Sequence, residues 1–246
     1  MAVLTHVSDK VDSESVRLIA FSARRGPFRL SRLDIQLNAE RIALIGVNGS
    51  GKTTLLRSML GVLRHSGTLL VGDVSSAHLP PERTGFVPQD VDFPLLLTVE
   101  ECVGMAADLK EVPAATRDRS VTDALAAVDL LDVRASRAAR LSGGQKRRLA
   151  CAQALVHDPQ IVLMDEPTAG LDPIQRDRLR RILQDLPRDR LVLVTSHILE
   201  DVAMWAERFL ILSEGEIIHD LQHDELGDPD QRLSALNDLL ASVPSR

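Results

Sequence analysis

The chain has 246 residues, of which 44% are hydrophobic and 26% are charged, and these proportions are typical of one large α/β domain. A formal net charge of −6, with five Phe, one Trp and no Tyr, argues against a nucleic-acid surface, which needs basic side chains and stacking rings. The two cysteines are isolated, which predicts reduced thiols in a cytosolic protein. No apolar run approaches ~18 residues, so we expect no membrane span. The N-terminal stretch lacks an apolar core, so we expect no leader.

Short apolar segments alternate with turns in the first part of the chain, which predicts strands between about residues 16 and 76. The run ERIALIG (Glu40–Gly46) reads as a strand that ends in glycine. It is followed by KTTLLRSMLGVL (Lys52–Leu63), which has helical character. Further short strands are expected at Gly67–Val71 and Thr84–Pro88.

Helical features dominate residues 90–140. The sequence TVEE contains a capping box, in which Thr98 caps a helix and Glu101 reaches back. Apolar residues at helical spacing follow at Val121, Leu125, Val128 and Leu131.

Strands and helices alternate again after Leu141, with strands at Ile161–Asp165 and Leu191–Ser196. Helices are expected around Pro173–Leu186 and around Ile198–Arg208. This order predicts a parallel sheet wrapped by helices, with a helical lobe inserted between its two halves. In the acidic tail, Leu233, Leu236 and Leu240 could form one face of a helix packed on its own domain.

The segment GVNGSGKT (Gly46–Thr53) matches the phosphate-loop pattern G-x-x-x-x-G-K-[ST] between a predicted strand and a predicted helix. Its glycines let backbone N–H groups wrap phosphates, and the helix dipole attracts the anion. Lys52 is expected to reach the β- and γ-phosphates of ATP, and the Thr53 hydroxyl to coordinate Mg²⁺. The expected phosphate-binding residues are Gly46, Asn48, Gly49, Ser50, Gly51, Lys52, Thr53 and Thr54.

Two adjacent carboxylates lie at the end of the predicted strand IVLMD: Asp165 is its last residue and Glu166 is the next one. Asp165 stands at the carboxyl end of this strand, where ligands of open α/β sheets gather, so we expect it to face the magnesium ion. Glu166 follows at once and is placed to orient and polarise the water that attacks the γ-phosphate.

A second glycine turn, LSGGQ (Leu141–Gln145), opens the segment KRRLACAQALV. Ser142 is a natural helix N-cap, and the bare amides of Gly143 and Gly144 can bind an anion. One chain thus carries two phosphate-binding surfaces, although one nucleotide site needs a single phosphate loop. The economical arrangement is two chains head to tail, each covering the nucleotide of the other.

The motifs GVNGSGKTT, LSGGQ, LMDEPTAGLD and TSH occur in this order, and with them the chain resembles the ATP-binding cassette (ABC) family from about Val16 to about His219. The resemblance implies the nucleotide-binding subunit of an ABC transporter. It also implies an α/β P-loop NTPase core with a mostly parallel sheet, an N-terminal antiparallel β region and an inserted helical subdomain. The expected single domain 1–246 divides into a nucleotide-binding core (16–89 and 141–218), a helical subdomain (90–140) and a C-terminal extension (219–246).

The resemblance also implies site residues outside the phosphate loop. Gln89 in FVPQD matches the glutamine loop of the family, which contacts Mg²⁺ or the attacking water. Asp172 in AGLD matches a loop that crosses the dimer interface, and His197 matches the switch histidine that contacts the γ-phosphate. In this arrangement ATP is held between the phosphate loop of one subunit, which contains Lys52, and Ser142–Gln145 of the other subunit. Lys52, Glu166, His197 and Gln89 are the implied catalytic residues.

One position departs from the family. An aromatic residue that stacks on adenine usually precedes the phosphate loop by about two dozen residues, and Arg25 occupies that position here. Phe28 could substitute, or the Arg25 guanidinium itself could stack on the base.

The implied function is an ATP-hydrolysing subunit that binds Mg-ATP at a head-to-tail dimer with a second copy or a homologous subunit. It powers a separate transmembrane permease, with no nucleic-acid partner, at the inner face of the cell membrane. The words FVPQ, LTVEE, AGLDPIQR and SHILEDV look most like exporter subunits. The alternatives are a soluble ABC ATPase with a partner outside transport and a small-molecule kinase, in which LSGGQ and Asp172 would have no use.

Overall fold

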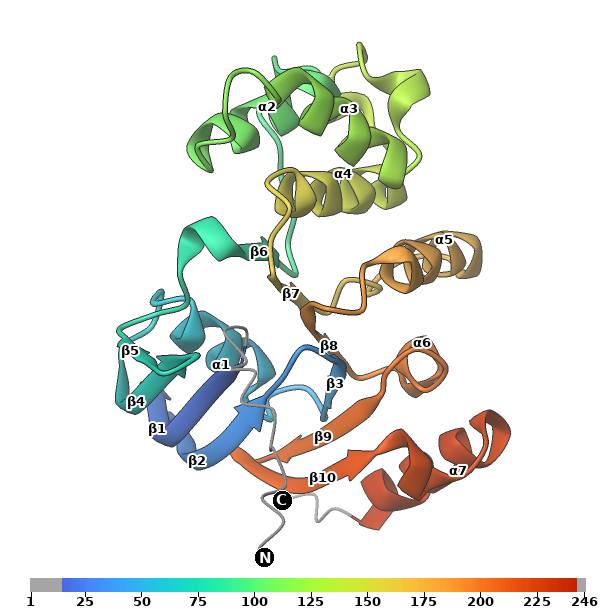
Figure 1. Ribbon diagram of the computed structural model, residues 1–246. Helices are drawn as coiled ribbons and strands as arrows, with labels where there is room; N and C mark the ends of the chain where they lie inside the picture. Colours follow the sequence, from blue (N-terminus) through green and yellow to red (C-terminus); the bar gives the residue numbers. More distant parts are fainter. Residues whose placement is uncertain (1–14, 243–246) are drawn as a thin grey trace, which may run out of the picture.

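The computed structural model describes residues 15–242, in which two sheets lie beside each other and a helical lobe lies at one end (Figure 1). The N-terminal stretch in which no leader is expected lies outside the described residues. The strands are β1 (Val16–Arg25), β2 (Phe28–Leu37), β3 (Arg41–Ile45), β4 (His65–Val71), β5 (Val74–Ser76), β6 (Thr84–Val87), β7 (Ile161–Asp165), β8 (Leu191–Ser196), β9 (Arg208–Ser213) and β10 (Glu216–Gln222). The helices are α1 (Lys52–Met59), α2 (Val99–Leu109), α3 (Arg117–Ala127), α4 (Gly143–Leu155), α5 (Pro173–Asp185), α6 (Leu199–Val202) and α7 (Pro229–Ser242).

The larger sheet has six strands in the order β10-β9-β3-β8-β7-β6, and all neighbours are parallel except β10 and β9. Every residue of β3, β7 and β8 is buried, as expected of strands that are covered on both faces. The parallel register brings the carboxyl ends of β3, β7 and β8 to one edge of the sheet, where their following loops meet.

The central strands supply two separate cores, one on each face of this sheet. Ile42 and Leu44 of β3 pack on the side of α1 and the smaller sheet, whereas Ala43 and Ile45 pack on the side of the helical lobe. Because successive side chains of a strand point to opposite faces, one short apolar run serves both cores.

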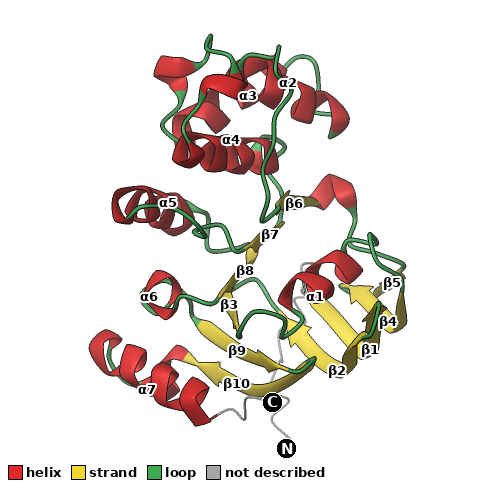
Figure 2. Ribbon diagram, turned by 180° about the vertical axis from the view of Figure 1, so that it is seen from behind, coloured by secondary structure: helices red, strands yellow, loops and turns green. Residues whose placement is uncertain are grey.

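The smaller sheet is antiparallel, in the order β2-β1-β4-β5, which confirms the predicted N-terminal β region. Strands β1 and β2 form a hairpin with the two-residue turn Gly26-Pro27. Figure 2 shows α1 between the two sheets, which places the start of this helix next to the hairpin.

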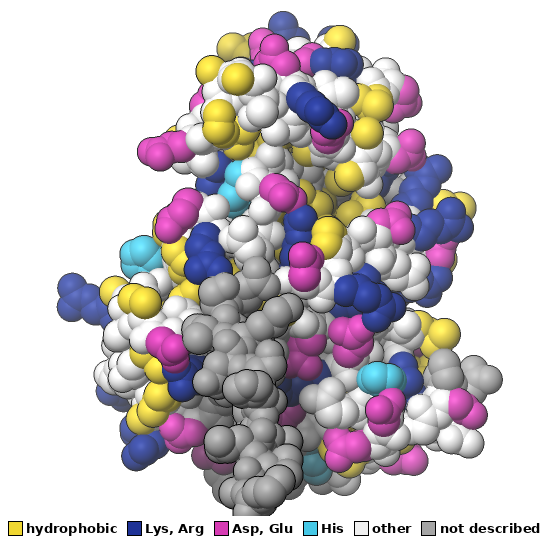
Figure 3. Space-filling view, in the orientation of Figure 1, with side chains coloured by type: hydrophobic (Ala, Val, Ile, Leu, Met, Phe, Trp, Pro, Cys, Tyr) yellow, Lys and Arg dark blue, Asp and Glu magenta, His cyan; other side chains and the backbone are white. Residues whose placement is uncertain are grey.

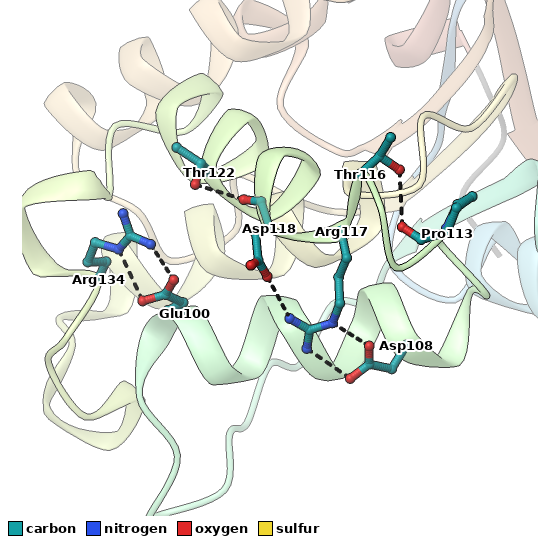
Figure 4. Close-up of polar contacts among 8 residues, drawn as sticks. All are labelled: Glu100, Asp108, Pro113, Thr116, Arg117, Asp118, Thr122 and Arg134. Carbon is teal, nitrogen blue, oxygen red and sulfur yellow. Dashed lines mark hydrogen bonds and ion pairs between the residues drawn. The ribbon is translucent and has the colours of Figure 1, made fainter.

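The helical lobe contains α2 and α3, and the predicted capping box opens α2. The Thr98 N–H donates to Glu101 Oε2 at 2.7 Å, and the Glu101 N–H donates to Thr98 Oγ1 at 3.2 Å. In the same lobe Arg117 at the start of α3 donates two hydrogen bonds to Asp108 near the end of α2 (Figure 4). Two helix ends are therefore tied by one bidentate pair.

Two predicted helices are shorter than the sequence suggests. Helix α1 ends at Met59 instead of Leu63, because Gly61 adopts a left-handed φ of 74° and the Val62 N–H bonds back to the Arg57 carbonyl in a Schellman turn. The helix expected around Ile198–Arg208 is the single turn α6, because the chain must extend again to pair β9 with β3.

Helix α7 packs on the larger core, as the leucine spacing of the tail predicts. Leu236 is fully buried, and Leu233 and Leu240 are partly buried against the same cluster. Among the described residues, none of the helices combines the length and the apolar character that crossing a bilayer requires.

Candidate functional site

A cleft of about 410 Å³ opens at the carboxyl edge of the large sheet, beside the β1–β2 hairpin. Its lining comes from four places in the chain: the hairpin, the glycine loop with the start of α1, the segment after β6 and the residue after β7. The lining residues are Arg25, Phe28, Asn48, Gly49, Gly51, Lys52, Thr53, Thr54, Gln89 and Glu166.

The glycine loop is held tightly against its surroundings. Gly51 has φ 113°, and a Cβ there would lie 2.6 Å from Phe28 Cζ, so the aromatic ring packs directly on this residue. The Gly215 N–H donates to the Ser50 carbonyl at 2.9 Å, which braces the loop from the other side. Gly51 is also the N-cap of α1 and supplies no capping side chain, so the first amides of α1 are left for a ligand.

Lys52 is buried and bent back into the loop that carries it. Its Nζ donates to the carbonyls of Gly46 at 2.7 Å and Val47 at 3.2 Å, and it lies 3.2 Å from Glu166 Oε1. An ammonium group held among acceptors at the start of a helix is the group that a phosphate would attract.

Asp165 and Glu166 are joined through a third residue that sequence reasoning missed. The Thr195 hydroxyl donates to Asp165 Oδ1 at 2.9 Å and accepts from the Glu166 N–H at 2.8 Å. All three residues are buried. Glu166 has φ 46°, a left-handed conformation that is uncommon outside glycine, and the Thr195 bond helps hold it there. The available signal was that Thr195 stands two residues before His197 in the TSH motif.

His197 contacts the same carboxylate. Its Nδ1 lies 3.0 Å from Glu166 Oε2, while Lys52 faces the other oxygen. The structure thus brings Lys52, Glu166 and His197 together in one row at the carboxyl edge of the sheet, with Asp165 behind Glu166.

Gln89 lines the cleft with an exposed side chain, and its backbone is anchored from the helical side. Arg147 of α4 donates to the carbonyl of Pro88 at 2.6 Å and to that of Gln89 at 2.7 Å. Burial lowers the pKa of Arg147 from its ordinary value. Sequence reasoning also missed Arg147, whose position in the basic run KRR after LSGGQ gave no hint of this contact.

The LSGGQ turn lies outside the cleft of its own chain. Ser142 caps α4 in a full capping box, because its Oγ accepts from the Gln145 N–H at 3.3 Å and its own N–H donates to Gln145 Oε1 at 3.0 Å. A Cβ built on Gly143 would meet no atom within 4 Å, so this residue is open to the outside.

Asp172 lies next to this turn. It caps α5 by accepting from the Gln175 N–H at 2.9 Å. A Cβ on Gly144 would lie 2.4 Å from Gln175 Oε1, which shows that the starts of α4 and α5 touch. The structure therefore gathers the predicted site residues into two groups, the cleft and this pair of helix starts.

The hairpin places both candidate base-binding residues at the cleft. Arg25 and Phe28 face each other directly across β1 and β2, and both line the cavity. Phe28 is half-buried against the glycine loop, whereas Arg25 is exposed.

A glycine loop between a parallel strand and a helix, with an acidic residue ending a strand nearby, defines the class of P-loop nucleotide-binding proteins. The ABC transporter family model matches residues 30–169. An uncharacterized ABC transporter ATP-binding protein of Nostoc sp. is 36% identical over 192 residues, which are 76% of this chain and 57% of that protein. This chain therefore spans just over half the length of that relative.

A second relative and a solved structure of the same fold are also similar to this chain. An energy-coupling factor transporter ATP-binding protein of Clostridium tetani is 33% identical over 218 residues, 84% of this chain and 73% of that protein. A dimeric ATP-binding cassette bound to ADP and Pi in a post-hydrolysis state has a TM-score of 0.75 at 24% identity, covering 85% of this chain and 98% of that chain. The chain belongs to the ABC transporter family, whose ATP-binding proteins are ATP hydrolases.

Proposed function

We propose that the chain hydrolyses Mg-ATP at a head-to-tail dimer interface and powers a separate membrane permease in the direction of export. Its working parts are a nucleotide-binding core (16–89 and 141–218), a helical subdomain (90–140) and a C-terminal extension (219–246). One observation carries the dimer: the LSGGQ turn is built for an anion but lines no part of the cleft that holds the glycine loop.

The helix start at Gly143 supports a ligand that comes from outside the chain. Helix α4 has 13 residues and directs its first amides and its dipole outward at an open glycine. The neighbouring start of α5, with Asp172, adds a second exposed segment to the same surface. A second copy turned head to tail would place these segments over the triphosphate in the first copy's cleft.

The residues of the cleft fit a nucleotide with a magnesium ion. Buried Ser50 Oγ finds no hydrogen-bond partner within residues 15–242, and Lys52 has only backbone carbonyls and Glu166 around its ammonium group. Thr53, Gln89 and Asp165 would supply oxygen ligands to Mg²⁺, a hard cation that prefers such donors. In the described part of the chain no group of three or more His, Cys, Asp or Glu could hold a metal ion. A magnesium ion held by these residues would neutralise charge on the phosphates.

Phosphate binding frees the catalytic carboxylate. In the structure Lys52 occupies one oxygen of Glu166 and His197 the other. When Lys52 turns to the β- and γ-phosphates, Glu166 Oε1 becomes available to orient the attacking water and take its proton. His197 then holds Glu166 and faces the γ-phosphate, and Arg25 with Phe28 receives the adenine.

The permease docks where the helical lobe meets the core. A groove of about 340 Å³ runs between the segment after β6 and helices α2 and α4. Met105 and Leu109 line it, and the nearby Leu95 and Leu96 are 74% and 76% exposed. Apolar side chains are visible over the helical lobe among charged ones (Figure 3). Exposed leucines next to a groove are typical of a surface that a partner covers. The export direction is supported by the sequence words FVPQ, LTVEE and SHILEDV.

The test combines a hydrolysis block with a block of the LSGGQ turn. Glu166→Gln removes the base, so turnover falls about a thousandfold while ATP binding persists and an ATP-dependent dimer becomes long-lived. Gly143→Asp in that background places a carboxylate where the partner's phosphate would bind, and the open space at Gly143 leaves the single chain unchanged. We expect it to abolish the dimer but keep ATP binding, as measured by size-exclusion chromatography with light scattering.

The matched control is Ala115→Asp, which adds the same charge at an exposed position of the helical lobe. This variant should dimerise normally. A Glu166→Gln protein that stays single-chained with ATP, or a Gly143→Asp variant that still dimerises, would contradict the proposal.

A further inference from the structure

A second, basic pocket lies on the small sheet and is not part of the nucleotide cleft. Its volume is about 310 Å³, and the side chains that matter are Arg24, Arg29, Arg64, His65, Ser22 and Ser66. We call it the sheet pocket. None of these residues lines the nucleotide cleft.

The register of the hairpin explains why the two sites are separate. Arg25 and Phe28 form the last pair of β1 and β2 and line the nucleotide cleft. Arg24 and Arg29 form the next pair. Because successive pairs point to opposite faces of a sheet, the second pair points away from the nucleotide. One hairpin therefore serves two sites, one on each face.

The arginines of the sheet pocket lie close together without acidic partners in the part of the chain that the structure describes. Like charges directly opposite each other on two strands are destabilising, and Arg24 faces Arg29 in that way. Within residues 15–242, no carboxylate lies within 4.0 Å of Arg24, Arg29 or Arg64. On the same strand, by contrast, Arg17 pairs with Asp73 at 2.6 Å. These exposed guanidinium groups are therefore open to an anion from outside the chain.

The strands that carry the sheet pocket are ordered from the opposite, buried face of the small sheet, where His65 pairs with Ala23 beside Phe21. The His65 ring stacks on Phe21 with centroids 4.5 Å apart and an interplanar angle of 26°. Its Nε2 lies 2.9 Å from the Ala77 carbonyl, to which it can only donate. Ser22 and Ser66 face each other across β1 and β4, so two hydroxyl donors lie beside the arginine pair.

We propose that the sheet pocket binds a phosphate-bearing anion, either free in solution or as a lipid headgroup. A carboxylate offers two oxygens and satisfies a single guanidinium fork, whereas a phosphate or pyrophosphate offers more oxygens and more charge. Three guanidinium groups and two hydroxyls match the larger anion. Occupancy removes the repulsion between Arg24 and Arg29, which stabilises the hairpin.

The experiment uses the full chain saturated with a non-hydrolysable ATP analogue, so that the glycine loop is filled. Calorimetric titration with pyrophosphate at low salt should reveal one additional site. The double variant Arg24→Ala/Arg29→Ala should weaken this site at least about tenfold, because it removes two charge-assisted contacts. Affinity for the ATP analogue, measured separately, tells a failure of the sheet pocket from a failure of the nucleotide cleft.

The matched control is Arg32→Ala, which removes an exposed arginine of β2 that does not line the sheet pocket. It should bind pyrophosphate like the unchanged chain. Arg64→Ala removes a charge from a different segment, so it tests the site even where the double variant fails to fold.

The lipid arm uses flotation with phosphatidylcholine vesicles with and without phosphatidic acid. Binding of pyrophosphate or of phosphatidic acid vesicles that depends on Arg24, Arg29 and Arg64 supports the proposal, and the stronger probe identifies the source. Binding of neither probe, or binding that the variants leave undiminished, overturns it.

Discussion

The starts of α1 and α4 are both glycine-containing helix turns suited to an anion, and the fold treats them in opposite ways. The start of α1 is enclosed: Gly51 packs on Phe28, Ser50 is braced by Gly215, and no side chain caps the helix. The start of α4 caps itself through Ser142 and leaves Gly143 open. The start of α1 is enclosed by its own chain and can bind a ligand without a second subunit. The start of α4 is capped by its own side chain, so it is stable without a ligand and can receive one that another subunit holds.

Replacing the glycine at the start of α1 or of α4 by alanine should give the largest difference in ATP affinity between the two helix starts. Gly51→Ala forces a side chain into a left-handed backbone, at about 1–2 kcal/mol, and into the Phe28 ring. We expect ATP affinity to fall about a hundredfold, roughly 2.7 kcal/mol. Gly143→Ala meets only open space, so nucleotide binding by the single chain should stay within about twofold. Equal effects of the two variants in a binding titration would remove the distinction between the two turns.

The enclosed site also depends on the residue that links its two acids. Thr195→Val keeps the shape but removes the bonds to Asp165 and the Glu166 N–H, so the rate of hydrolysis should fall about 10- to 100-fold with less change in KM. Thr84→Val is the matched control, because the buried Thr84 hydroxyl has no hydrogen-bond partner within residues 15–242. Unchanged turnover of Thr195→Val in a steady-state assay would exclude this role for the hydroxyl.

The far end of α4 carries a pH-dependent contribution to stability. Burial, together with nearby Lys110, lowers the pKa of His157 from 6.5 to about 4. The folded state therefore favours neutral His157. Its contribution to the free energy of unfolding is complete above about pH 6.5 and is lost as the pH falls towards 4, by about 1–2 kcal/mol once the solvent screening of this partly exposed ring is included.

His157→Gln, which can still donate to the Thr84 carbonyl, should flatten this part of the pH profile in denaturant unfolding measured between pH 7 and pH 4.5. An identical slope in both proteins would assign the acid sensitivity to other groups.

The smallest effect concerns the cap of the open turn. Ser142→Ala removes the N-cap of α4 and should lower the free energy of unfolding by about 1 kcal/mol. Thr98→Ala removes the equivalent cap of α2 and should lower it by a similar amount. Only Ser142→Ala should also weaken the ATP-dependent dimer, as measured by light scattering. Equal dimerisation of both variants would leave Ser142 with a capping role alone.

Local patterns predict the parts of the fold whose partners are close in sequence. The capping boxes at Thr98 and Ser142 and the glycine loop Gly46–Thr53 can be read from adjacent letters, because each is completed within eight residues. The length of α1 could not be read in this way. Helical character continues to Leu63 in the sequence, but a left-handed Gly61 ends the helix at Met59.

The sequence by itself determined the phosphate loop, the acidic pair and the helix start at Ser142, since backbone freedom at glycine and the alternation of apolar residues are local properties. Only the tertiary structure decided which of these groups meet. The parallel register of β7 and β8 puts Thr195 between Asp165 and Glu166, and Arg147 reaches the backbone at Gln89 from another helix. Such contacts join residues about 30 to 60 positions apart, and their distances depend on how the strands and helices pack.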